Sequence, residues 1–75
     1  MNKKTYQRIR DLREDRDWTQ KKVADELGLW LNTYRSYETG LREPPFYITI
    51  EIAKLYGVSL DYIAGLIDVP EKLKR

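Results

Sequence analysis

The sequence contains no cysteine and no histidine. Without a thiol or an imidazole, the chain cannot form a disulfide bond, a thiolate nucleophile, an imidazole base or a zinc finger. No apolar run approaches the roughly 18 residues that a membrane span needs, and the residues after Met1 are polar or basic rather than an apolar signal core. These absences exclude most familiar enzyme chemistry and favour a cytoplasmic protein outside the membrane.

The acidic side chains offer no alternative catalytic site. Asp and Glu are scattered along predicted helices, no pair is set at the ends of elements, and no glycine-rich loop is present to cradle a phosphate. The sequence therefore predicts a protein that is not an enzyme and that needs neither a metal nor a cofactor.

Length and charge narrow the possibilities further. A chain of 75 residues buries too little surface for two independent units, so a single domain is expected. Residues 1–22 carry eight Lys and Arg against four Asp and Glu, whereas the rest of the chain has a net charge of −2. The basic half could face phosphate groups, or the asymmetry could be ordinary surface charge.

Five short helices are predicted from hydrophobic periodicity and from residues that begin or end helices. They cover residues 5–14, about 20–27, 31–39, 45–56 and a short segment from residue 60. Thr19 and Ser59 are expected to cap the second and fifth helices, while Gly28 and Gly40 end the second and third. With no strand pattern, repeat or linker, the predicted fold is an all-α bundle.

Apolar side chains at helical spacing form the expected core. The inward-facing set is Tyr6, Ile9, Leu12, Val23, Ala24, Leu27, Leu29, Tyr34, Tyr37, Phe46, Ile48, Ile52, Ala53, Leu55, Tyr56, Leu60, Ile63 and Ala64. The domain should span residues 1–69, with residues 70–75 as a C-terminal tail. Leu66, Ile67 and Val69 could contact a second copy of the chain, or they could form the ragged edge of the core.

Residues 20–40 match the spacing of a helix-turn-helix, in which two helices cross closely at about 90–120°. Ala24 is small where the helices approach each other, and Gly28 lies at the turn. The inward positions between them are apolar: Val23, Leu27, Leu29, Tyr34 and Tyr37. The spacing therefore predicts a helix-turn-helix and places both tyrosines in the core rather than on a base-stacking surface.

Several segments resemble the XRE-like helix-turn-helix family, the type represented by phage lambda repressor and Cro. They are residues 9–13, 18–20, 23–28, 33–40, 42–45, 52–59 and 60–63. The resemblance implies a compact five-helix, lambda-repressor-like domain that binds double-stranded DNA sequence-specifically as a repressor-like transcriptional regulator. Residues 31–39 would lie in the major groove, and a homodimer would bind two half-sites about one helical turn apart. The chain has no room for a small-molecule effector domain.

The resemblance also assigns base-reading residues to segment 31–39. Arg35 would direct its guanidinium to guanine O6 and N7 or to a phosphate, and Asn32 could pair with adenine. Thr33 and Ser36 could hydrogen-bond a phosphate or a base edge.

Other residues are assigned to the phosphate backbone or to the fold. Gln20 would meet a phosphate at the start of its helix while its side chain braces the recognition helix. The remaining backbone candidates are Thr39, Arg42 and either Lys21 or Lys22, although the lysines could equally be solvated surface charges. Arg10 and Glu38 resemble a structural ion pair that ties the first helix to the end of the third.

Two residues depart from the family pattern at the start of the recognition helix. Trp30 and Leu31 stand where polar residues are usual, so the helix loses a side-chain cap and one hydrogen-bonding reader. Leu31 could instead pack on a thymine methyl group, with Trp30 along a sugar and phosphate. Alternatively, Trp30, Leu31 and Tyr47 could form an apolar surface of a protein-interaction or designed oligomerisation module. Their clustering at usually polar positions also suggests the hypothesis of an engineered variant.

Overall fold

The helix boundaries follow local signals in the sequence. The computed structural model describes residues 3–70, whose regular elements are helices. They are α1 (Lys3–Asp15), α2 (Gln20–Leu27), α3 (Leu31–Thr39), α4 (Phe46–Tyr56) and α5 (Leu60–Ala64). The five predicted helices are confirmed, and residues 71–75 of the predicted tail lie outside the described part of the chain. No helix within residues 3–70 combines the length and apolar character needed to cross a bilayer.

Two helices begin at the predicted side-chain caps. Thr19 Oγ1 accepts a hydrogen bond from the backbone N–H of Lys22 at 3.0 Å, and Ser59 Oγ accepts one from Tyr62 at 3.2 Å. α3 begins without such a bond, because its N-cap residue is Trp30, whose indole has no acceptor. The start of α3 therefore depends on its contacts with the rest of the domain.

A glycine makes the tight turn between α2 and α3. Gly28 has φ +69°, in the left-handed region that disfavours residues with a Cβ atom. Its N–H donates to the carbonyl of Asp25 at 3.1 Å, and the N–H of Leu29 donates to the carbonyl of Ala24 at 2.8 Å. These bonds end α2 and direct the chain into α3, which packs on α2 to form the predicted helix-turn-helix.

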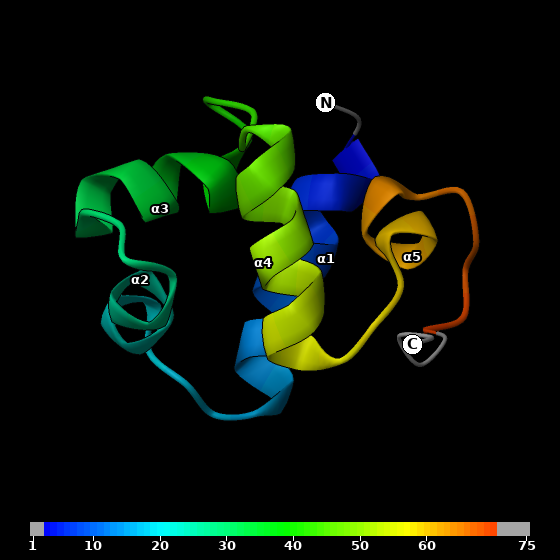
Figure 1. Ribbon diagram of the computed structural model, residues 1–75, viewed down its shortest axis with the longest axis horizontal. Coiled ribbons are helices and arrows are strands. Elements are labelled where there is room, and N and C mark those ends of the chain that lie inside the picture. The colour runs from blue at the N-terminus through cyan, green and yellow to red at the C-terminus, as the bar shows by residue number, and fades with distance from the viewer. Residues whose placement is uncertain (1–2, 71–75) are drawn as a thin grey trace.

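The core lies where α1, α4 and α5 meet the helix-turn-helix. In Figure 1, α4 runs through the middle in front of α1, with α2 and α3 on one side and α5 on the other. α1 packs against both α3 and α5 and so joins the two sides. The buried apolar side chains are Ile9, Leu12, Val23, Ala24, Tyr34, Tyr37, Ile48, Ile52, Ala53, Tyr56, Val58 and Ile63. Both tyrosines of α3 are core residues, as predicted.

Two residues of the predicted core lie on the surface instead. Phe46 is 72% exposed, and Ala64 is also exposed. A helix turns by about 100° per residue, so Phe46 points about 200° away from the buried Ile48, toward the opposite side of α4. Ala64 follows the buried Ile63 by one residue and turns out of the core in the same way. Other predicted core residues are half-buried at its edge: Tyr6, Leu27, Leu29, Leu55 and Leu60.

Gly40, which ends α3, is expected to tolerate alanine less well than Gly57, which ends α4. Both glycines have positive φ, +80° and +67° respectively. In the described part of the chain, an added Cβ at Gly40 would lie 2.6 Å from Tyr6 Cε1, whereas one at Gly57 would meet nothing within 4 Å. Gly57→Ala should lower the free energy of unfolding by about 1–2 kcal/mol through backbone strain, and Gly40→Ala should lower it further by displacing the Tyr6 ring.

Urea unfolding of the two variants, followed by circular dichroism, measures this difference. In a Tyr6→Ala background the excess cost of Gly40→Ala should disappear, because the clashing ring is gone. Equal costs for the two glycines in the otherwise unchanged chain would contradict the steric explanation.

Candidate nucleic-acid interface

α3 has two faces of different character. Asn32, Arg35 and Thr39 are exposed, whereas Tyr34 and Tyr37 are buried. Residues three or four positions apart share one face of a helix, so the three exposed side chains form a single polar stripe. The stripe offers amide, guanidinium and hydroxyl groups to the solvent. These groups are suited to hydrogen-bonding base edges and phosphates.

Ser36, predicted to contact DNA, is not part of the exposed stripe. It is only 8% exposed, and its hydroxyl donates to the carbonyl of Thr33 at 2.6 Å. Its own carbonyl accepts from the N–H of Arg42 at 3.1 Å and from the hydroxyl of Thr39 at 3.2 Å. The turn after α3 therefore folds back over Ser36, and the prediction for this residue is corrected. Thr33 is half-buried beside it.

The start of α3 carries the exposed tryptophan that the sequence predicts. Trp30 is 85% exposed, while Leu31 is half-buried and packs partly against the core. A hollow of about 540 Å³ lies next to them, lined by Lys21, Asp25, Gly28, Leu29, Trp30 and Leu31. Lys21 is exposed there, with its Nζ atom 3.3 Å from the Asp25 carboxylate. This region therefore offers an aromatic surface beside a lysine that is paired with an acid.

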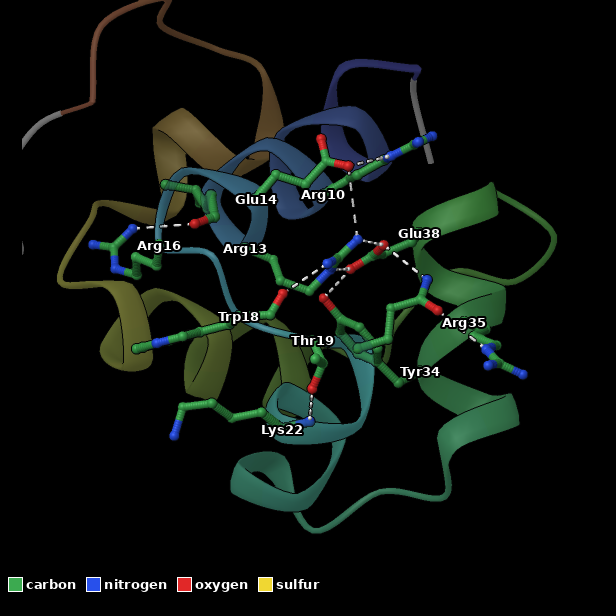
Figure 2. Close-up of polar contacts among 12 residues, drawn as sticks. Arg10, Arg13, Glu14, Arg16, Trp18, Thr19, Lys22, Tyr34, Arg35 and Glu38 are labelled. Atoms are coloured by element: carbon green, nitrogen blue, oxygen red, sulfur yellow. Dashed lines mark hydrogen bonds and ion pairs between the residues drawn. The ribbon is translucent and has the colours of Figure 1, made fainter.

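Glu38, near the end of α3, is the centre of a polar network that reaches three helices. Its side chain is 2% exposed. Arg13 of α1 donates to it from Nε at 2.7 Å and from Nη2 at 3.1 Å, and Gln20 of α2 donates from Nε2 at 3.1 Å. The Tyr34 hydroxyl donates to it as well, and Figure 2 shows Arg13 and Tyr34 directed at the carboxylate. The network fixes α3 against both neighbouring helices.

The predicted ion pair between Arg10 and Glu38 is wrong, because Glu38 pairs with Arg13 instead. The Arg10 side chain is 60% exposed and its Nε donates to Glu14 at 3.3 Å. Arg13 lies four residues after the buried Ile9, on the side of α1 that faces α3, and its side chain is 13% exposed. In the sequence, the spacing of Ile9 and Leu12 identifies the buried face of α1. That spacing is the signal by which Arg13 could be found.

Gln20 joins this network to the exposed stripe of α3. While its Nε2 atom donates to Glu38, its Oε1 atom accepts from Arg35 Nε at 3.1 Å. The predicted bracing of the recognition helix by Gln20 is therefore present. In residues 3–70 the other guanidinium donors of Arg35 make no hydrogen bond, so they remain available to a ligand.

Protonation states in the network follow from burial and hydrogen bonding. Burial by itself would raise the pKa of Glu38, but hydrogen bonds from Arg13, Tyr34 and Gln20 outweigh it and hold this pKa below its usual value. The hydrogen bond that Arg13 donates to Glu38 raises the pKa of Arg13. Burial raises the pKa of Tyr34, and the hydrogen bond that Tyr34 donates to Glu38 raises it further. Glu38 is therefore an anion at neutral pH, while Arg13 and Tyr34 keep their protons.

The exposed groups of α3 are suited to hydrogen bonding. They are the amide of Asn32, the guanidinium of Arg35 and the hydroxyl of Thr39. Within residues 3–70 no three acidic side chains gather into a possible metal site.

The stability of the domain is expected to decrease in acid through Glu38. Because the folded-state pKa of Glu38 is depressed, the stability it contributes is present above its unfolded-state pKa and is lost as pH falls through the folded-state value. Glu38→Gln should lower the free energy of unfolding at pH 7 by about 3–5 kcal/mol, since it removes the buried anion to which Arg13 donates two hydrogen bonds. It should also flatten the pH dependence below about pH 5.

Urea unfolding between about pH 3 and pH 7 tests this, with Glu51→Gln as the matched control. Glu51 is half-exposed in its pairing with Lys54, so its substitution should cost less than about 1 kcal/mol. If the acid-dependent loss of stability were as steep in Glu38→Gln as in the unchanged chain, Glu38 would not be its source.

Known proteins resemble this chain along most of its length. A Vibrio cholerae protein named cryptic phage CTXphi transcriptional repressor RstR is 42% identical over 72 residues, which cover 89% of this chain and 62% of that protein. The uncharacterized HTH-type transcriptional regulator YobD of Bacillus subtilis strain 168 is 39% identical over 70 residues, covering 92% and 62% respectively. ImmR, an HTH-type transcriptional regulator of the same strain, is 32% identical over 65 residues, covering 87% and 51%.

These relatives are longer than the region they share with this chain. The chain spans about three fifths of the length of the first two. No solved structure shows a significant match. The helix-turn-helix family profile matches residues 9–63, which include α2, the turn and α3. The chain therefore belongs to the helix-turn-helix family, in its XRE type.

Proposed function

We propose that this domain binds double-stranded DNA sequence-specifically as part of a transcriptional regulator. The observation that carries the proposal is the polar stripe of Asn32, Arg35 and Thr39, exposed on a helix that the buried Glu38 holds against its neighbours. A helix of this kind fits the major groove, where side chains reach base edges. The relatives named as transcriptional regulators and repressors support this role and not an enzymatic one.

Base reading is assigned to the exposed stripe. The fork of the Arg35 guanidinium matches guanine O6 and N7, and the Asn32 amide matches the N6 and N7 edge of adenine. Contacts with the phosphate backbone are assigned to Gln20, Lys21, Thr39 and Arg42, at the start of α2 and the end of α3. Leu31 is assigned to a thymine methyl group, and the exposed Trp30 ring to a neighbouring sugar and phosphate.

We further propose that the regulator acts as a homodimer in the cytoplasm. Leu66 and Val69 are exposed and Ile67 is half-buried, so these residues offer apolar surface after α5 for a second copy. A two-fold dimer would place its two copies of α3 about one helical turn of DNA apart. The alternative of a protein-interaction module around Trp30, Leu31 and Tyr47 has no support among the relatives, although Trp30 and Tyr47 are exposed.

Selection of duplexes from a random DNA library should enrich one sequence, and a dimer would make it palindromic. The affinity for the enriched duplex should decrease steeply with salt, because binding that neutralises several phosphates releases counterions. Titration at several salt concentrations, with the mass of the free protein measured in parallel, tests both points. An interaction that hardly responds to salt, with no enriched duplex, would contradict DNA recognition.

Arg35→Ala should weaken binding to the enriched duplex by about 1–3 kcal/mol and relax the preference at one base pair. Lys54→Ala is the control: Lys54 is an exposed lysine on α4 that pairs with Glu51 at 3.6 Å and lies outside the helix-turn-helix. Fluorescence anisotropy with duplexes carrying each of the four base pairs measures both effects. Unchanged affinity and preference in Arg35→Ala would remove this residue from the interface.

A further inference from the structure

Four polar side chains from three helices are linked in series from the core to the surface. Arg13 of α1 binds Glu38 of α3, Glu38 binds Gln20 of α2, and Gln20 binds Arg35 on the exposed face of α3. Exposure increases along the series, from the buried Glu38 through the half-buried Gln20 to the exposed Arg35. A buried carboxylate is thus connected to the residue assigned to base reading, although it does not reach the surface itself.

The ionised carboxylate determines which way the Gln20 amide points. A carboxylate can only accept hydrogen bonds, so the Gln20 NH₂ group and not its oxygen must face Glu38. The low pKa of Glu38 keeps that group an acceptor throughout the neutral range. The Gln20 oxygen is therefore turned away from the core, toward Arg35 Nε at 3.1 Å.

Gln20 in turn determines which edge of the Arg35 guanidinium is available. Because Nε donates to Gln20, the edge formed by Nε and one Nη atom is partly occupied. The edge formed by the two Nη atoms is left for a ligand. Two parallel N–H groups at that edge match the paired acceptors O6 and N7 of guanine.

We propose that Gln20 and Glu38 are positioning residues that set the base preference of Arg35. The carboxylate orients the amide, the amide holds the guanidinium, and the guanidinium presents one edge to the DNA. The preference at the base pair read by Arg35 then depends on Gln20 beyond any contact that Gln20 makes with a phosphate. This inference rests on the proposed function and adds the origin of its specificity.

The test compares Gln20→Leu, Arg35→Ala and the double variant on the enriched duplex and its three counterparts at the base pair read by Arg35. Gln20→Leu keeps the approximate size of the side chain and removes both hydrogen bonds. It should reduce the preference at that base pair by about three- to tenfold, while the double variant should show no more loss of preference than Arg35→Ala. Lys21→Ala is the control for a phosphate contact, and it should reduce the affinity for all four duplexes by the same factor.

A measurement on the free protein gives an independent readout. In nuclear magnetic resonance spectra, the Nε–H signal of Arg35 should shift and exchange faster with solvent in Gln20→Leu, whereas that of Arg42 should not change. Arg42 is the matched exposed arginine just after α3. An unchanged Arg35 signal would overturn the proposal without any reference to DNA.

The DNA outcomes separate the two proposals. Suppose that a duplex is enriched but Gln20→Leu weakens binding to all four duplexes equally, or that its effect adds to that of Arg35→Ala. Gln20 is then a backbone contact, and only the positioning proposal fails. If Arg35→Ala leaves the base preference unchanged, the positioning proposal fails while DNA recognition stands. If no duplex is enriched, both proposals fail.

Discussion

The buried charge of Glu38 is the constraint on which the arrangement of the helix-turn-helix depends. An ion removed from water is costly unless several donors compensate it, and removing one partner leaves the others uncompensated. The compensating donors come from Arg13 on α1, Gln20 on α2 and Tyr34 on α3 itself. The carboxylate receives all of its hydrogen bonds only when the three helices take one relative position. Apolar contacts alone would define that position less sharply.

This constraint divides α3 into a face that maintains the fold and a face that is free to recognise a ligand. Tyr34, Tyr37 and Glu38 hold the helix, while Asn32 and Arg35 point into solvent. The same division explains how Trp30 is tolerated where a capping residue is usual. α3 lacks a side-chain cap at its start, but the buried contacts further along stabilise it, and such packing contributes more to most protein helices than their own ends do.

Local features and the buried face of α3 were predictable from the sequence, whereas side chains whose place depends on one particular contact were not. The Thr19 and Ser59 caps and the Gly28 turn require only nearby residues, and the structure has them where they were predicted. The sequence does not show that Phe46 faces outward, because the apolar residues of α4 are too numerous to indicate which ones face inward. The spacing of Ser36 does not show that the residue is buried, with its hydroxyl bound to the carbonyl of Thr33. Family resemblance points to Arg10 as the partner of Glu38, whereas the buried Ile9 and Leu12 place Arg13 on the inner face of α1.

The polar network also limits how the recognition surface can change. A substitution at Asn32 alters a side chain that the network does not hold, so it leaves Arg13, Glu38 and Gln20 as they are. A substitution at Arg35 also removes the partner of the Gln20 oxygen. That oxygen cannot turn inward to replace the lost bond, because Glu38 offers no donor. It must instead bind water or a new side chain at the same place, and this requirement couples position 35 to position 20 although they lie on different helices.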